Sequence, residues 1–274
     1  MKILSGMSLE EITAFVEEMN ASKFRAKQIH NWIYSKSVSS IDEMTDLAKT
    51  FREELKQKAV VTESKIKVKQ ESSDGALKYL IEYPDGECVE TVLMRFDNRA
   101  NLTACVSSQV GCAVNCSFCA TGKRGFIRNL TYQEIIEQVL TIQRDTGLKV
   151  TNIVFMGQGE PLLNLNNVLK ALEIFNNDFQ IGARRITIEY ILIKDFNSDI
   201  ETAKNLAYFL KDLKCNINLI PYNDVTNTGY KKPSNNEIMK FKYLLEHSGK
   251  KVTVRLERGA DIDAACGQLS GKAG

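Results

Sequence analysis

The chain has 274 residues, of which 43% are hydrophobic and 26% are charged, and its formal net charge is +2. This length allows one large domain, or one domain with an appendage, around a substantial core. No apolar run reaches the roughly 20 residues that span a bilayer, and the first residues lack the apolar stretch of a signal peptide. We therefore expect a cytoplasmic protein without a membrane partner. The small net charge decides little about nucleic-acid binding, for which a local basic patch suffices.

The N-terminal part of the chain predicts a small helical module. Helical periodicity covers residues 8–20, 24–36 and about 41–58. Ser8 is a suitable N-cap for the first helix, because Glu11 three residues later completes a capping box.

A change of period near residue 60 predicts a small antiparallel sheet. Apolar and polar residues alternate over 65–70 and over 77–96, and Pro84-Asp85-Gly86 supplies a turn. Residues 101–109 form a further predicted strand, which leads directly into a loop rich in cysteine.

Helices and strands alternate in the rest of the chain. Strands are expected at 150–157, 184–193, 215–223 and 250–257, and helices at about 131–146, 165–176, 198–212 and 235–248. Apolar strands separated by helices indicate parallel βαβ units, either doubly wound or curled into a barrel. Ligands of such folds bind at the carboxyl ends of the strands. The cysteine loop, the sequence GQGEP, the sequence PYN and the tail after Glu257 all follow strands, so we expect a single active site there.

Three cysteines within eight residues, Cys112, Cys116 and Cys119, give the clearest chemical signal. In a reducing compartment such clusters indicate metal or redox chemistry rather than structural disulfides. A structural zinc site needs four closed ligands, and both histidines, His30 and His247, are distant in the sequence. Three thiolates can instead hold an iron–sulfur cluster that leaves one iron open for a small-molecule ligand. A zinc-stabilised module and buried core cysteines are the alternatives at this point.

The motifs around these cysteines resemble those of the RlmN/Cfr group of radical S-adenosylmethionine (SAM) RNA adenine methyltransferases. The resemblance covers nearly the whole chain and is carried by ACVSSQVGCAVNCSFCATG, MGQGEPLLN, INLIPYN, RGADIDAACGQL and KFRAKQIHNWIY. It implies an α/β fold based on a shortened partial parallel (β/α) barrel of the radical SAM type, with a small N-terminal helical module and an antiparallel β extension. The implied division is an RNA-binding helical module at 1–60, a β extension or linker at 61–100, and a radical SAM core with a cysteine tail at 101–274.

The resemblance also implies the cofactors. The three loop cysteines would bind a [4Fe-4S] cluster whose free iron chelates SAM, which one electron splits to give a 5′-deoxyadenosyl radical. The implied SAM contacts are Gly159, Glu160 and Asn223. A glycine permits close backbone approach, and a carboxylate suits the SAM ammonium group. From the residues alone, GQGEP is equally compatible with a strand-to-helix turn, and Asn223 with an ordinary turn.

Catalysis in the family implies roles for Glu90, Cys105 and Cys266. Cys266 would be methylated by one SAM, and the radical from a second SAM would take a hydrogen atom from that methyl group. The resulting carbon radical would add to C2 of an adenine. Cys105 would then attack Cys266 to release the product with formation of a disulfide, and Glu90 would accept the C2 proton.

The implied partners are 23S rRNA and tRNA, together with an electron donor such as flavodoxin or ferredoxin, and the enzyme would be a monomer. The RNA has to present a flipped or unpaired adenine. We expect phosphate contacts from Lys123, Arg124 and Arg128, which lie beside the cysteine loop. The aromatic and basic residues of the helical module are candidates for stacking, although an ordinary solvated helix face is the simpler interpretation.

One segment departs from the family pattern. Relatives carry further βα units between the GQGEP strand and the INLIP strand, whereas here GARRIT passes at Thr187 directly into IEYILIKDFNSD. The comparison with the family pattern therefore predicts that about two βα units are deleted after Thr187, together with their SAM contacts. This predicts that cluster ligation survives while SAM affinity and turnover are weakened. The alternatives to an active C2 methyltransferase are a catalytically impaired RNA-binding remnant and a relative specific for C8.

Overall fold

The computed structural model describes residues 1–274 except 97–98, 118, 180–186, 212–214, 223–228 and 256–274. Its elements in chain order are β1 (Lys2–Ile3), α1 (Leu9–Glu18), α2 (Lys23–Tyr34), the 3-10 turn η1 (Ile41–Glu43), α3 (Lys49–Lys58), β2 (Ala59–Val60), β3 (Lys65–Glu71), β4 (Leu77–Glu82), β5 (Cys88–Phe96), β6 (Arg99–Cys105), β7 (Gln109–Gly111), α4 (Ala120–Arg124), β8 (Phe126–Asn129), α5 (Tyr132–Thr146), β9 (Asn152–Val154), the 3-10 turn η2 (Pro161–Asn164), α6 (Leu165–Asn177), β10 (Thr187–Leu192), α7 (Ile200–Phe209), β11 (Asn216–Pro221), α8 (Asn235–His247) and β12 (Lys251–Val254).

The first helix, α1, begins where its predicted N-cap Ser8 places it. The Ser8 N–H donates to Glu11 Oε2 at 2.9 Å, and the Glu11 N–H donates to Ser8 Oγ at 3.2 Å. The single helix expected over 41–58 is wrong in its first half, which is the short turn η1 followed by irregular chain. The physical reason is a second capping box, because Ser40 and Glu43 cap η1 and the chain ends that turn at Met44.

A five-stranded sheet forms the centre of the molecule, with the strand order β3-β4-β5-β6-β9. The pairs from β3 to β6 are antiparallel, which confirms the small antiparallel sheet, and the turn at Gly86 joins β4 to β5. The β6–β9 pair is parallel. The antiparallel extension and the first parallel strands of the core are therefore one continuous sheet.

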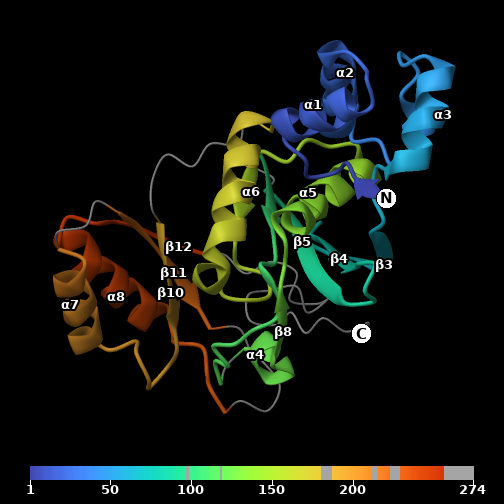
Figure 1. Ribbon diagram of the computed structural model, residues 1–274. Helices are drawn as coiled ribbons and strands as arrows, with labels where there is room; N and C mark the ends of the chain where they lie inside the picture. The colour runs from blue at the N-terminus through green and yellow to red at the C-terminus, as the bar shows by residue number, and fades with distance from the viewer. Residues whose placement is uncertain (97–98, 118, 180–186, 212–214, 223–228, 256–274) are drawn as a thin grey trace.

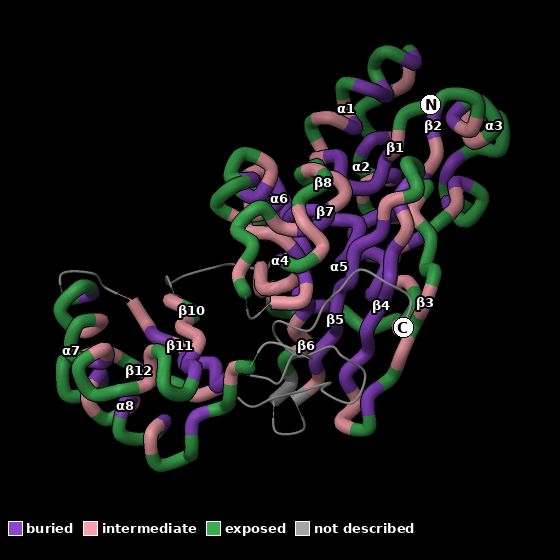
Figure 2. Tube along the Cα trace, turned by 90° about the horizontal axis from the view of Figure 1, so that it is seen from below, coloured by how far each residue is buried: buried purple, intermediate pink, exposed green. Residues whose placement is uncertain are grey.

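Helix α5 is buried in the same apolar core as this sheet. It is capped by Thr131 and Glu134, and every residue from Ile135 to Gln143 is buried. Figure 2 shows buried chain running through α5, β4 and β5. One continuous apolar core contains residues from Leu4 to Phe175, so the N-terminal helices, the sheet, α5 and α6 pack together.

A second, smaller sheet has the parallel order β10-β11-β12 and is covered by α7 and α8. It confirms the predicted parallel βαβ units, and it has its own apolar core that includes Leu192, Leu219 and Phe241. Within the described residues, β9 and β10 are both edge strands and do not pair with each other. The barrel is consequently open, and Figure 1 shows the small sheet with α7 and α8 standing apart from the larger unit.

Candidate active site

The carboxyl ends of the parallel strands β6 and β9 lie side by side. Cys105 at the end of β6 is in register with Val154 at the end of β9. The segments that follow these two strands then pair with each other, because the Gly157 N–H donates to the Val106 carbonyl at 3.1 Å. The predicted convergence of GQGEP with the chain leading to the cysteine loop is confirmed.

Glycine is required where GQGEP packs against the residues after β6. Gly159 has a φ of +93°, and a Cβ there would lie 2.5 Å from Gln109 Cβ and 2.7 Å from Gln109 N. The adjacent Glu160 N–H donates to Gln109 Oε1 at 2.9 Å, while its own carboxylate accepts the Leu162 N–H at 3.1 Å. The close approach expected at Gly159 is present, and the chain that it approaches is the protein's own.

The cysteine loop is held by a tight hairpin between β7 and β8. The Cys112 N–H donates to the Gly125 carbonyl at 3.0 Å, and the Cys119 N–H donates to the Cys116 carbonyl at 3.0 Å. A Cβ on Gly122 would lie 2.9 Å from the Cys116 carbonyl oxygen, so the loop folds closely onto α4. All three loop cysteines are half-buried.

The loop thiols and Glu160 share one electrostatic environment. Burial raises the pKa of the Cys116 thiol, and the nearby Cys119, Cys112 and Glu160 raise it further. Among the residues that the structure describes, no three His, Cys, Asp or Glu side chains are already arranged to hold a metal ion, so ligation requires the loop to draw its thiols together. The donor set of three thiols without a local fourth fits a cluster with an open iron better than a closed zinc site.

The face of the central sheet beneath these loops carries Glu90 and Cys105. Val92 on β5 pairs with Cys105 on β6, and side chains two residues apart on a strand share a face, so Glu90, Val92 and Cys105 lie on the same side. Glu90 is 1% exposed and Cys105 is 5% exposed. A small apolar cluster that includes Met94 surrounds Cys105 on this face.

The carboxyl end of β12 also reaches this face. Arg255 Nη1 donates to Met156 Sδ at 2.7 Å and Nη2 donates to Met94 Sδ at 3.3 Å. The predicted site residues Asn223 and Cys266 lie outside the described residues. Asn223 directly follows Tyr222, which is buried at the end of β11.

Comparisons with known proteins agree with this arrangement. Residues 3–61 match the Ribosomal RNA large subunit methyltransferase N-terminal domain, and residues 106–246 match the Radical SAM superfamily. The chain is 37% identical to the probable dual-specificity RNA methyltransferase RlmN of Alkaliphilus oremlandii, over 98% of the chain and 97% of that relative. It is 38% identical to the dual-specificity RNA methyltransferase RlmN of Francisella tularensis, over 98% of the chain and 92% of that relative.

The chain belongs to the RlmN family of radical SAM RNA methyltransferases. The family is one of SAM-dependent enzymes, so the predicted family and enzyme class are confirmed. The crystal structure of a radical SAM methyltransferase from Sphaerobacter thermophilus confirms the fold class, with a TM-score of 0.90 and 31% identity over 99% of this chain and 100% of that one. Among the described residues, no helix combines the length and apolarity that a membrane crossing needs.

The alignments with RlmN relatives are longer than the chain. They extend over 337 and 344 positions, whereas the chain has 274 residues. Because nearly all of both proteins is covered, the relatives contain internal residues that have no counterpart here. This agrees with the internal deletion expected from the sequence, and β9 and β10, which are edge strands among the described residues, precede and follow the GARRIT junction in the chain.

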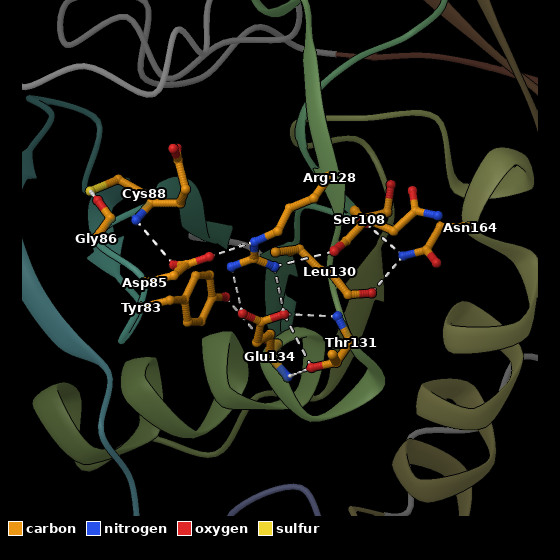
Figure 3. A network of polar contacts seen from close by, with 12 residues as sticks. Tyr83, Asp85, Gly86, Cys88, Ser108, Arg128, Leu130, Thr131, Glu134 and Asn164 are labelled. Carbon is orange, nitrogen blue, oxygen red and sulfur yellow. Dashed lines mark hydrogen bonds and ion pairs between the residues drawn. The ribbon is translucent and has the colours of Figure 1, made fainter.

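Two basic residues expected to contact phosphate in this RlmN-family chain, Arg128 and Arg124, have partners within the protein, and Figure 3 shows those of Arg128. Arg128 forms a bidentate pair with Glu134, at 3.0 and 2.8 Å, and its Nε donates to Asp85 Oδ2 at 2.6 Å. Arg124 pairs with Glu87 at 3.0 Å. Arg128 is therefore a structural clamp between β8, α5 and the β4–β5 turn, and the expectation that it contacts RNA phosphate stays a prediction.

Sequence reasoning missed three residues that contact the candidate site. Lys78 pairs with Glu90, Gln158 donates to Glu90, and Arg255 contacts the methionines described above. Gln158 lies inside GQGEP, so that motif contained a usable signal. Lys78 and Arg255 lie at strand positions that resemble ordinary solvent-facing ones, and only the pairing of distant strands brings them to the site.

Proposed function

We propose that this chain methylates C2 of an adenine in 23S rRNA and in tRNA through an S-methylated Cys266. It would act as a cytoplasmic monomer that receives electrons from a donor such as flavodoxin or ferredoxin. The observation that carries the proposal is the packing of GQGEP against the chain that leads from β6 to the cysteine loop, where the Gly157 N–H donates to the Val106 carbonyl at 3.1 Å and the Glu160 N–H donates to Gln109 Oε1 at 2.9 Å. Radical SAM chemistry needs a cluster site and a SAM site in contact, and the proximity of GQGEP to the chain leading into the cysteine loop supports such an arrangement.

The proposed binding roles follow from the chemistry of the side chains. Cys112, Cys116 and Cys119 would hold a [4Fe-4S] cluster, and Gly159, Glu160 and Asn223 would contact SAM. Together the bound cluster and SAM supply a radical. The Glu160 carboxylate accepts only a backbone N–H of η2 among the contacts described above, and an ammonium group is a stronger partner for it.

The proposed catalytic roles belong to the face of the central sheet. Glu90 would accept the proton from adenine C2 on a carboxylate oxygen, and Cys105 would form a disulfide with Cys266 as the product leaves. Support comes from the shared face of Glu90 and Cys105 and from their burial, which keeps water away from both groups.

Anaerobic reconstitution with iron and sulfide tests the cluster. Cys119→Ser is expected to lose the brown colour and all methylation, whereas Cys215→Ser, a half-buried cysteine on the small sheet without an assigned role, is expected to keep both. A colourless wild-type protein that binds zinc through the same cysteines would contradict the proposal.

The reaction itself is tested with methyl-labelled SAM, a reductant, and 23S rRNA or tRNA from cells that lack the modification. After digestion, 2-methyladenosine supports the proposal, and 8-methyladenosine would identify the C8-specific alternative. Mass spectrometry of Cys266 separates methylation of the cysteine from modification of the RNA. An S-methyl group on Cys266 requires working SAM chemistry even when RNA is not modified.

A catalytically impaired RNA-binding remnant is the second candidate, and it is favoured because β9 and β10 have no pairing partner on one side among the described strands. A parallel barrel that lacks interior strands also lacks their loops, which reduces the contacts available to SAM. Calorimetry of the reconstituted protein is expected to give weakened or absent SAM binding, with RNA binding retained. SAM binding as tight as that of the Alkaliphilus oremlandii relative under the same conditions would exclude this candidate.

A further inference from the structure

A buried lysine lies beside the proposed proton acceptor. Lys78 Nζ on β4 is 3.2 Å from Glu90 Oε1 on β5, and the two side chains are only 10% and 2% exposed. In the antiparallel β4–β5 pair, Lys78 is opposite Val92 and Leu80 is opposite Glu90, so Lys78 and Glu90 are diagonal neighbours on one face. Lysine and glutamate are almost never fully buried unless they are paired, so each side chain supplies the charge that the other needs.

Gln158 holds the second carboxylate oxygen. Its Nε2 donates to Glu90 Oε2 at 3.4 Å. The same residue is tied to Glu90 through the backbone, because the Gln158 N–H donates to Ser107 Oγ at 2.9 Å and that hydroxyl donates to the Glu90 carbonyl at 2.7 Å. Gln158 is completely buried and belongs to GQGEP, so the proposed base is connected directly to the motif next to the cysteine loop.

We propose that Lys78 is a positioning residue whose ammonium group keeps the buried Glu90 ionised and, together with Gln158, fixes the orientation of its carboxylate. This inference rests on the proposed function, in which Glu90 accepts a proton and therefore has to be ionised beforehand. A carboxylate buried without its countercharge takes up a proton instead, and a protonated Glu90 has no capacity to accept another.

Infrared spectroscopy tests the charge of Glu90 without turnover. The Glu90 bands are identified from the difference between wild type and Glu90→Gln. In Lys78→Met, we expect the carboxylate band of Glu90 to be lost and a protonated-acid band to appear, while Lys78→Arg keeps the carboxylate band. The matched control is Lys67→Met, which removes an exposed lysine paired with Glu82 at 2.7 Å in the same sheet and is expected to change nothing at Glu90. An unchanged Glu90 carboxylate band in Lys78→Met would overturn the proposal.

A double variant covers the case in which Lys78→Met does not fold. If the unpaired Glu90 charge is the cause, Lys78→Met/Glu90→Gln is expected to fold, because removing both charges leaves no buried ion. Failure of the double variant as well would show that Lys78 serves the fold independently of Glu90 and would overturn the proposal.

Activity separates this inference from the proposed function. In an active chain, Lys78→Met is expected to lower kcat by about 10²-fold or more, the range for loss of a general base, with the KM for RNA unchanged. If Lys78→Met shifts the Glu90 band but the wild-type chain never produces methyladenosine, the effect of Lys78 on Glu90 is supported and the proposed function is rejected. Methylation with a full kcat in Lys78→Met would reject the positioning role alone.

Discussion

At the scale of single residues, the candidate site depends on close approaches that only glycine permits. Gly159 and Gly157 both lie against the chain that follows β6, where a Cβ would come within 2.7 Å of neighbouring atoms. These contacts bring GQGEP to the cysteine loop, so the glycines of this motif act first through packing. The sequence motif predicted a close approach correctly, but only the folded chain identifies Gln109 as the partner.

Substitution of Gly159 tests this packing role. Gly159→Ala is expected to lower the free energy of unfolding by about 2–4 kcal/mol, because it adds a clash with Gln109 to the strain of a positive φ. Gly75→Ala is the control, since Gly75 has a φ of +79° but an added Cβ would meet nothing within 4 Å, and its expected cost is about 1 kcal/mol. Urea unfolding monitored by fluorescence measures both, and equal costs would contradict the packing role.

At the scale of elements, β8 is fixed by Arg128 to two other parts of the fold. Figure 3 shows the guanidinium between Asp85 of the β4–β5 turn and Glu134 in the first turn of α5, close to the Tyr83 ring. The hydrogen bond from Arg128 holds the pKa of Asp85 below its ordinary value of 3.8. This clamp positions the hairpin that carries the cysteine loop.

The clamp predicts a pH dependence that Asp85→Asn removes. Asp85 has a lowered pKa in the folded state, so its contribution to stability is present above pH 3.8 and is lost as the pH falls through that lowered value. Because the side chain is 44% exposed, we expect wild type to exceed Asp85→Asn by only about 0.5 kcal/mol at pH 7. Urea midpoints from pH 7 to about pH 3 should converge, and a constant difference would contradict this origin.

The helices and strands that the sequence predicted well are those with local signals, such as a helix cap or an alternation of apolar and polar residues. The capping box at Ser8 gave a correct helix start, and alternation gave the antiparallel strands of the central sheet. The helix over 41–58 was predicted too long, because the capping box of Ser40 and Glu43 begins only the short turn η1. The strand expected over 150–157 shortens to Asn152–Val154, since it pairs only where β6 offers a partner.

The candidate site, like the helices and strands, was predictable from the sequence where its residues lie in contiguous motifs. The cysteine loop and GQGEP are contiguous motifs, so their residues could be named from the sequence. The partnership of Lys78 with Glu90 depends on the register between two strands, and no local pattern specifies it. The role of Glu90 itself rests on family resemblance, because an isolated glutamate in an alternating strand normally faces solvent.

At the scale of the whole molecule, the chain consists of two units with separate cores. The large unit contains the core from Leu4 to Phe175, and the small unit contains the core that includes Leu192 and Phe241. Described contacts between them include those of Arg255 with the two methionines and a hydrogen bond of 2.9 Å between Ser117 and Tyr230. No described pair of helices or strands with substantial contact crosses the boundary. Units joined so weakly are expected to unfold separately.

Separate unfolding can be measured because the chain has a single tryptophan, Trp32, which lies in the large unit. Trp32 fluorescence should follow the large unit alone, whereas far-ultraviolet circular dichroism should show an additional transition from the small unit. Ser8→Ala and Ser234→Ala form a matched pair, since each removes the N-cap of one helix, α1 or α8, at an expected cost of about 1 kcal/mol. Ser8→Ala should shift the fluorescence transition, and Ser234→Ala should shift only the transition seen by circular dichroism. If both variants moved both signals together, the two units would form one cooperative structure, and a barrel closed across β9 and β10 in solution would be the better description.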